Sequence, residues 1–295
     1  MTDYPVDMGL RPEVTTFFDP PTNTFSYVVK DPASSACAII DSVMDIDYAA
    51  GRIGYESADR IIAFIRDRNL TLEWIIETHV HADHLSAAPY IQEQLGGKIG
   101  IGDRIMVVQE TFGKYFNEGT AFQRDGSQFD RLFQDGDTYR IGTMPAFAMF
   151  TPGHTPACMV HVVGNAAFVG DTLFMPDSGS ARADFPGGDA GTLFDSIQRV
   201  LSLPDDMRLF MCHDYGAGGG RDVANETTVA EEKHNNIHVG AGRTKEDFIR
   251  FRTERDAQLD MPRLIIPSLQ VNMRAGKVPR DTDGNMVLKV PLNGL

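Results

Sequence analysis

Residues 72–84 read LEWIIETHVHADH, and this stretch decides the fold of the 295-residue chain. Its first part, LEWIIE, is largely apolar and rich in β-forming residues, so it predicts a buried strand. Side chains two apart in extended backbone point to the same side, so His79 and His81 can converge on one point. Asp83 and His84 can bend around that point as the chain turns into the next element. Four metal-competent side chains within six residues predict a metal site.

Three further motifs place a ligand-type side chain directly after a predicted strand. His154 lies in TPGHTP after the apolar run PAFAMF, Asp171 lies in GDTLF after AAFV, and His213 lies in CHDY after RLFM. A rigid sheet can hold several such loops around one site. The three motifs therefore predict additional ligands for the site that His79 begins.

The composition excludes several classes of protein. The chain carries 27 Lys and Arg against 41 Asp and Glu, a formal net charge of −14. This balance argues against a nucleic-acid partner, because phosphate binding relies on Lys and Arg, and against an anionic membrane surface. The opening MTDYPVDMGL lacks the regions of a signal peptide, and no run approaches the ~20 apolar residues that span a bilayer. Cys37, Cys158 and Cys212 are too few for a disulfide framework, so we expect a cytoplasmic protein.

The pattern of apolar residues predicts an α/β (α+β) fold class. Alternation and glycine-bounded apolar runs predict strands at 23–30, 36–41, 72–77, 99–101, 145–150, 158–163, 166–169 and 208–212. Spacings of three and four residues predict helices that begin at Ser57, Ser86 and Thr192, and the tail holds one predicted helix, 245–259. We expect a domain over residues 1–220. Residues 221–295 would form an extension that packs on this domain or in a homodimer interface.

The ordered motifs resemble those of a known superfamily. His-x-His-x-Asp-His, then Thr-Pro-Gly-His-Thr, Gly-Asp-Thr and a last His are similar to the metallo-β-lactamase superfamily over roughly residues 15–215. The resemblance implies an αββα sandwich: two mixed β-sheets face to face, helices outside, and a metal site at one sheet edge. Membership of a superfamily does not by itself give the reaction.

Two metal occupancies are implied by the resemblance. In the dizinc hydrolases of the superfamily, one ion would take His79, His81 and His154, the other Asp83, His84 and His213, with Asp171 as a bridge. The alternative is a single Fe(II) on His79, His154 and Asp171, the ligand set of non-haem iron oxygenases. Spacing alone leaves both occupancies open, because both use the same scaffold.

Other segments resemble the persulfide dioxygenases (sulfur dioxygenases) within the superfamily. These are MPDSGSARADFPGG at 175–188, CHDYG at 212–216 and LQVN at 269–272. The resemblance implies one Fe(II) per chain, with His81, Asp83, His84 and His213 lining the site without a second metal. It also implies that Arg182 contacts a glutathione carboxylate and that Tyr215 lies beside the substrate.

The resemblance therefore implies an enzyme that oxidises glutathione persulfide with O2 to sulfite and glutathione. The alternative is a dinuclear zinc hydrolase of the same fold, a glyoxalase II-like thioesterase or a lactonase. The expected partners are a small-molecule thiol persulfide and O2, together with a second copy of the chain if the extension forms an interface. His161, His234 and His238 lie outside the motifs, and we expect them to be ordinary surface or core histidines.

Overall fold

The computed structural model describes residues 6–293, which form two six-stranded sheets and one three-stranded sheet. The first sheet has the order β1 (Glu13–Asp19), β2 (Thr24–Lys30), β3 (Ala36–Ile40), β6 (Thr71–Ile76), β8 (Lys98–Gly102), β9 (Arg131–Phe133). The second has the order β10 (Thr138–Ile141), β11 (Met144–Phe150), β12 (Met159–Val163), β13 (Ala166–Phe168), β14 (Arg208–Phe210), β15 (Glu226–Thr228). The small sheet joins β5 (Arg52–Gly54), β4 (Val43–Asp47) and β7 (Leu85–Ser86).

The two large sheets lie face to face because their strands carry apolar side chains on both sides. In β2, Tyr27 and Val29 enter the core between the sheets, whereas Val28 faces the outer core of the first sheet. In β11, Ala148 points inward and Phe147 points to the outer core of the second sheet. This period of two is what pleated backbone imposes on a strand that is covered on both faces. Both sheets are mixed, since β3–β6 and β13–β14 are parallel pairs among antiparallel ones.

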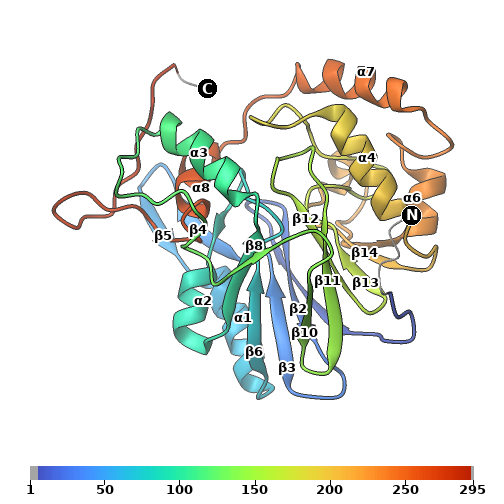
Figure 1. Ribbon diagram of the computed structural model, residues 1–295, viewed down its shortest axis with the longest axis horizontal. Helices are drawn as coiled ribbons and strands as arrows, with labels where there is room; N and C mark the ends of the chain where they lie inside the picture. The colour runs from blue at the N-terminus through green and yellow to red at the C-terminus, as the bar shows by residue number, and fades with distance from the viewer. Residues whose placement is uncertain (1–5, 294–295) are drawn as a thin grey trace.

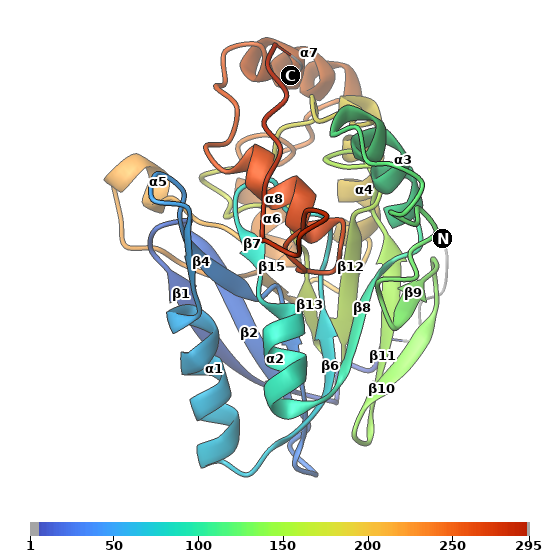
Figure 2. The same ribbon diagram turned by 90° about the vertical axis from the view of Figure 1, so that its left-hand side faces the viewer.

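Helices cover the outer face of each sheet (Figures 1 and 2). Those that pack with the first sheet are α1 (Glu56–Asp67), α2 (Ala88–Leu95), α3 (Ile105–Tyr115) and α8 (Ile265–Asn272). Those that pack with the second are α4 (Ala190–Leu201), α6 (Val229–Asn235) and α7 (Lys245–Asp256). Each amphipathic helix buries one apolar stripe against a sheet, as a layered domain requires. The predicted αββα sandwich is confirmed.

The C-terminal region is more regular than the sequence predicted. One helix was expected there, and that prediction was wrong, because α6 and α8 flank α7. The helix α8 is buried almost all round and therefore lacks a periodic polar face, and Pro267 sits in its first turn, where proline is tolerated. The strand β15 pairs with β14, so the second sheet continues beyond residue 220. The division at that residue stays a prediction.

Candidate metal centre

The structure brings all seven predicted metal-site side chains together at one edge of the sandwich. The loop after β6 carries His79, His81, Asp83 and His84, and the loops after β11, β13 and β14 carry His154, Asp171 and His213. Ligand-type atoms fall into a first group of His79, His154 and Asp171, and a second group of His81, Asp83, His84 and His213, each within 4.8 Å. Six of the seven are buried, and Asp83 is partly exposed.

The first group consists of two histidines that face one carboxylate. The Nε2 atoms of His79 and His154 lie 3.9 and 3.6 Å from Oδ2 of Asp171. These distances are too long for hydrogen bonds. One ion about 2 Å from each ligand atom fits such a gap.

Hydrogen bonds fix the tautomers of both histidines in the first group. His154 Nδ1 lies 2.7 Å from the carbonyl oxygen of Arg182, which only accepts, so Nδ1 carries the proton. His79 Nδ1 lies 3.0 Å from Thr78 Oγ1, whose own proton goes to Asp41. Each histidine therefore directs an Nε2 lone pair toward Asp171. This second partner on the far nitrogen is typical of metal-binding histidines.

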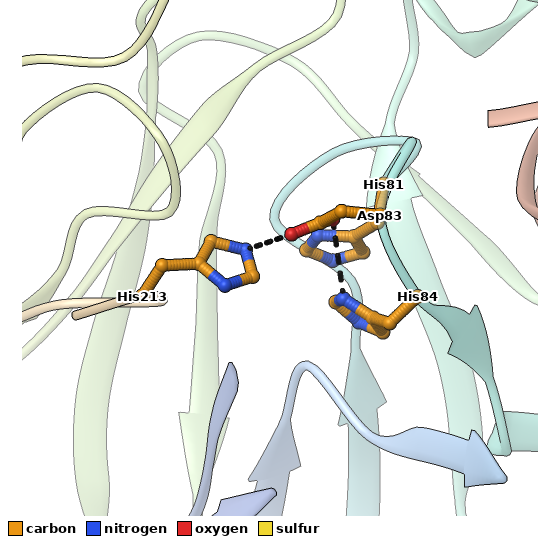
Figure 3. A group of neighbouring side chains, drawn as sticks. All are labelled: His81, Asp83, His84 and His213. Atoms are coloured by element: carbon orange, nitrogen blue, oxygen red, sulfur yellow. Dashed lines mark ion pairs between the residues drawn. The ribbon is translucent and has the colours of Figure 1, made fainter. Parts of the chain in front are cut away.

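The second group is held by close contacts among its own members. Oδ2 of Asp83 lies 3.1 Å from His213 Nε2, and Oδ1 lies 3.4 Å from His84 Nδ1. Figure 3 shows Asp83 between the two rings, with His81 close by. Asp171 Oδ1 lies 3.4 Å from His213 Nε2, so the Asp171 carboxylate spans both groups.

Two buried carboxyls that the sequence analysis did not single out hold His81. Its Nε2 lies 3.0 Å from Asp41 Oδ1 and 3.4 Å from Glu77 Oε2. Asp41 also accepts hydrogen bonds from the Thr78 backbone and hydroxyl at 2.7 and 2.9 Å. Both acids lie at the ends of strands, and this position was the one feature of the sequence that could have identified them. Many solvated carboxyls occupy the same kind of position, so the feature is not specific. Asp41 thus orients the first turn of the HVHADH loop.

Burial sets the protonation states within the site. Burial, together with the neighbouring histidines, holds the pKa of His79 well below its usual value and lowers that of His84 to about 4. Burial would also lower the pKa of His81, but the Asp41 and Glu77 carboxylates outweigh it and raise the pKa. His79 is therefore neutral and able to act as a ligand at neutral pH, whereas His81 keeps its proton on Nε2.

The C-terminal helix α8 stabilises the ligand loop from outside. Asn272 Nδ2 donates to the backbone carbonyls of His81 and His84 at 2.9 and 2.8 Å, and its Oδ1 accepts from the Ser86 N–H at 2.8 Å. The LQVN segment therefore contacts the metal loop across 191 and 188 residues of sequence. In the sequence, only the resemblance to the persulfide dioxygenases draws attention to this segment.

A cleft of about 780 Å³ leads from the surface to the first group. Asp83, His154 and Asp171 line its inner end, and Arg182, Tyr215 and His238 line its sides. The ring of Tyr215 is half exposed, and its centroid lies 6.4 Å from that of the His213 ring.

The Arg182 guanidinium pairs with Asp184 through contacts of 2.5 and 2.7 Å and donates to the Asp260 carbonyl. A substrate carboxylate bound by Arg182 would have to share the guanidinium N–H groups with Asp184 and the Asp260 carbonyl. His238, expected to be ordinary, belongs to the cleft.

The donor atoms fit a metal ion. Within residues 6–293, the buried atoms without a hydrogen-bond partner include His79 Nε2, His84 Nε2, His213 Nε2 and Asp171 Oδ1. Buried polar atoms normally have partners, and imidazole nitrogens with carboxylate oxygens suit Zn, Fe or Mn. The cluster supports a metal cofactor, and its composition does not choose between iron and zinc.

Comparison with known proteins places the chain in a family. Residues 19–213 match the family model of the metallo-beta-lactamase superfamily. The chain belongs to the metallo-β-lactamase superfamily. It is 54% identical to a probable metallo-hydrolase of Burkholderia pseudomallei, over 96% of this chain and 99% of that protein. The resemblance of the HVHADH, TPGHT and GDT motifs to this superfamily is therefore confirmed.

The persulfide dioxygenase group is also among the relatives. The chain is 29% identical to the human mitochondrial persulfide dioxygenase ETHE1, over 88% of this chain and 87% of that protein. The crystal structure of ETHE1 from Myxococcus xanthus superposes with a TM-score of 0.71 at 28% identity, covering 90% of this chain and all of that one. The predicted resemblance to this group of the superfamily is confirmed. Among the residues described, no helix is long and apolar enough to cross a membrane.

Proposed function

We propose that the chain is a non-haem Fe(II) persulfide dioxygenase that oxidises glutathione persulfide. His79, His154 and Asp171 would hold one iron, and the redox chemistry of that iron would let O2 react with the outer sulfur. Overall, the persulfide, O2 and water give glutathione, sulfite and protons: the S–S bond breaks, sulfur is oxidised and O2 is reduced. The roles assigned to these residues are those implied by the similarity to the persulfide dioxygenases.

One observation carries the choice of iron over two zinc ions. The first group contains two histidines and one carboxylate. His81 gives its Nε2 to Asp41 and Glu77, and its unpartnered Nδ1 lies in the second group, with Asp83, His84 and His213, rather than in the first. A dizinc site needs His81 as a third histidine beside His79 and His154. Two histidines with one carboxylate leave coordination positions open for substrate and O2.

The cleft residues have positioning roles in this proposal. Asp83, at the inner end, would hold the rings of His213 and His84 in place through its two carboxylate oxygens. The Tyr215 hydroxyl would hold a sulfur or oxygen atom beside the metal group, and Arg182 would face a glutathione carboxylate. The pairing of Arg182 with Asp184 also fixes the loop whose carbonyl orients His154.

A dinuclear zinc hydrolase of thioesters or lactones is the second candidate. It is favoured by the unpartnered Nε2 atoms of His84 and His213 and by the Asp171 carboxylate that spans both groups. The printed name of the Burkholderia relative also points to hydrolysis. In this candidate a metal-bound hydroxide would be the nucleophile.

Oxygen uptake separates the two candidates. Protein loaded anaerobically with Fe(II) is expected to consume O2 only after glutathione persulfide is added, with sulfite formed in equal amount. The matched control is protein loaded with zinc, which is expected to consume none. Absence of O2 uptake by the iron form, together with thioester or lactone hydrolysis by the zinc form, would overturn the proposal.

A further inference from the structure

Two arginines of the C-terminal segment line the cleft without a partner. Arg255, in the last turn of α7, and Arg263, in the loop before α8, are exposed, and both lie on the cleft wall. Within residues 6–293, no side chain forms a hydrogen bond or ion pair with either guanidinium. Both keep their full set of donors for a ligand.

The other arginines of the same cleft are neutralised. Arg182 pairs with Asp184, and the buried Arg252 pairs with Asp256 at 2.6 Å. Asp260 is the acidic residue of the C-terminal wall, while Asp83 and Asp171 lie at the metal end. In a chain of net charge −14, the two unpaired arginines outnumber Asp260 and give the C-terminal wall of the cleft a positive excess. A positive excess of this kind attracts and orients anions.

The adjoining His238 is built into the wall as a neutral donor. Its Nδ1 accepts the Ser180 N–H at 2.9 Å, so Nε2 carries the ring proton. Burial, followed by the nearby arginines, lowers the pKa of His238 to about 4. The Phe251 ring packs on it at 4.5 Å between centroids, and a Cβ at Gly179 would come within 2.2 Å of Nδ1. Gly179 therefore keeps the space that this ring occupies.

We propose that Arg255 and Arg263 together bind one carboxylate of an anionic peptide thiol, the other being the one that Arg182 would face, so that the C-terminal segment selects the carrier of the reacting sulfur. Guanidinium forks match carboxylates with two hydrogen bonds each. The apolar face of Phe251 and the His238 donor would contact the uncharged part of the peptide. That the bound thiol carries a persulfide rests on the proposed function. The binding of the carboxylate by the two arginines does not depend on the proposed function.

A binding experiment tests the arginines without turnover. Titration calorimetry with S-methylglutathione compares the wild type with R255Q/R263Q, and R243Q is the control because Arg243 is exposed but does not line the cleft. The double variant is expected to raise Kd by about tenfold or more, and R243Q by less than about twofold. The dimethyl ester of S-methylglutathione is expected to bind weakly and equally to all three. Equal Kd values for wild type and double variant would overturn the proposal, as would tight binding of the ester to the wild type.

Steady-state kinetics extends the test to the iron-loaded enzyme. With glutathione persulfide, R255Q/R263Q is expected to raise KM by about tenfold while kcat changes by less than about twofold. With 2-mercaptoethanol persulfide, whose carrier has no carboxylate, neither constant should change. Equal losses with both substrates would contradict carrier selection. If no form consumes O2 but the calorimetric difference stands, the proposed function fails and the arginine site survives.

Discussion

The two ligand groups of the centre differ in what satisfies their side chains. In the first group, Asp171 Oδ2 stays 3.6 and 3.9 Å from two imidazole nitrogens whose protons sit on the opposite ring atoms. In the second, Asp83 reaches His213 at 3.1 Å, and His81 reaches Asp41 at 3.0 Å. The Nε2 proton of His81 bridges its contact with Asp41, whereas His213 Nε2 has no hydrogen-bond partner. The first set has no proton to share, so it needs a cation more strongly.

This difference indicates that a motif can contain every ligand-type residue of a metal site although those residues have unequal roles. His81 and His84 stand in the same short loop as His79, yet carboxylates already contact both. We therefore expect metal affinity to depend steeply on the first group and weakly on the second. Each substitution below tests one side of that expectation.

The largest effect is expected from His154→Ala. Losing one of two histidine ligands should remove the metal and reduce activity below about 1%, because even outer partners of ligands contribute 10–100-fold. Metal content and O2 uptake measure the loss. His234→Ala is the matched control, since the exposed His234 side chain, among the residues described, bonds only within its own helix. If the His154 variant retained its metal, the first group would not be the group that holds the metal.

His84→Ala should have a smaller effect on activity, about tenfold or less, and leave one ion bound. The reason is that His84 contacts the first group only through its neighbours. Elemental analysis of the variant and the wild type, purified in parallel, measures the number of ions per chain. Loss of one of two ions together with all activity would favour the dinuclear hydrolase.

Asn272→Ala should destabilise the ligand loop from the side of α8. It leaves two buried carbonyls and the Ser86 N–H without partners, at a cost of roughly 2–4 kcal/mol in the free energy of unfolding. Urea denaturation measures that free energy. Asn235→Ala, which removes one exposed hydrogen bond, is the control. Equal midpoints for the two variants would show that α8 does not support the loop.

Glu232→Gln tests a buried carboxyl that lies outside both groups. Burial raises the Glu232 pKa to about 8 from 4.5, so the unfolded state ionises first as pH rises. Wild-type stability should therefore fall between about pH 4.5 and 8. The free energy of unfolding of the variant, relative to that of the wild type, should rise by up to about 5 kcal/mol across that window. Thermal unfolding at several pH values measures this, with the exposed Glu231→Gln as control. If the free energies of unfolding of the wild type and the variant differed by the same amount from pH 4.5 to 8, the raised pKa of Glu232 would be contradicted.

Local sequence patterns predicted the parts of the molecule that depend on local chemistry. The α1 stripe of Ala58, Ile61, Ile62 and Ile65 is buried, because helical spacing and burial express the same periodicity. The ligand residues sit at strand ends, where the motifs placed them. Asp41 and Asn272 were not assigned roles because their contacts cross 37 and about 190 residues of chain. Likewise, only the folded cleft distinguishes the unpaired Arg255 from the paired Arg252.

Metal content of the wild type tests the central claim most directly. Protein produced without added zinc, and purified without oxygen, should contain one iron per chain and no stoichiometric zinc. The first group would then be the occupied one, with the second held by its own contacts. Two zinc ions per chain, in protein that consumes no O2 with glutathione persulfide, would contradict the account.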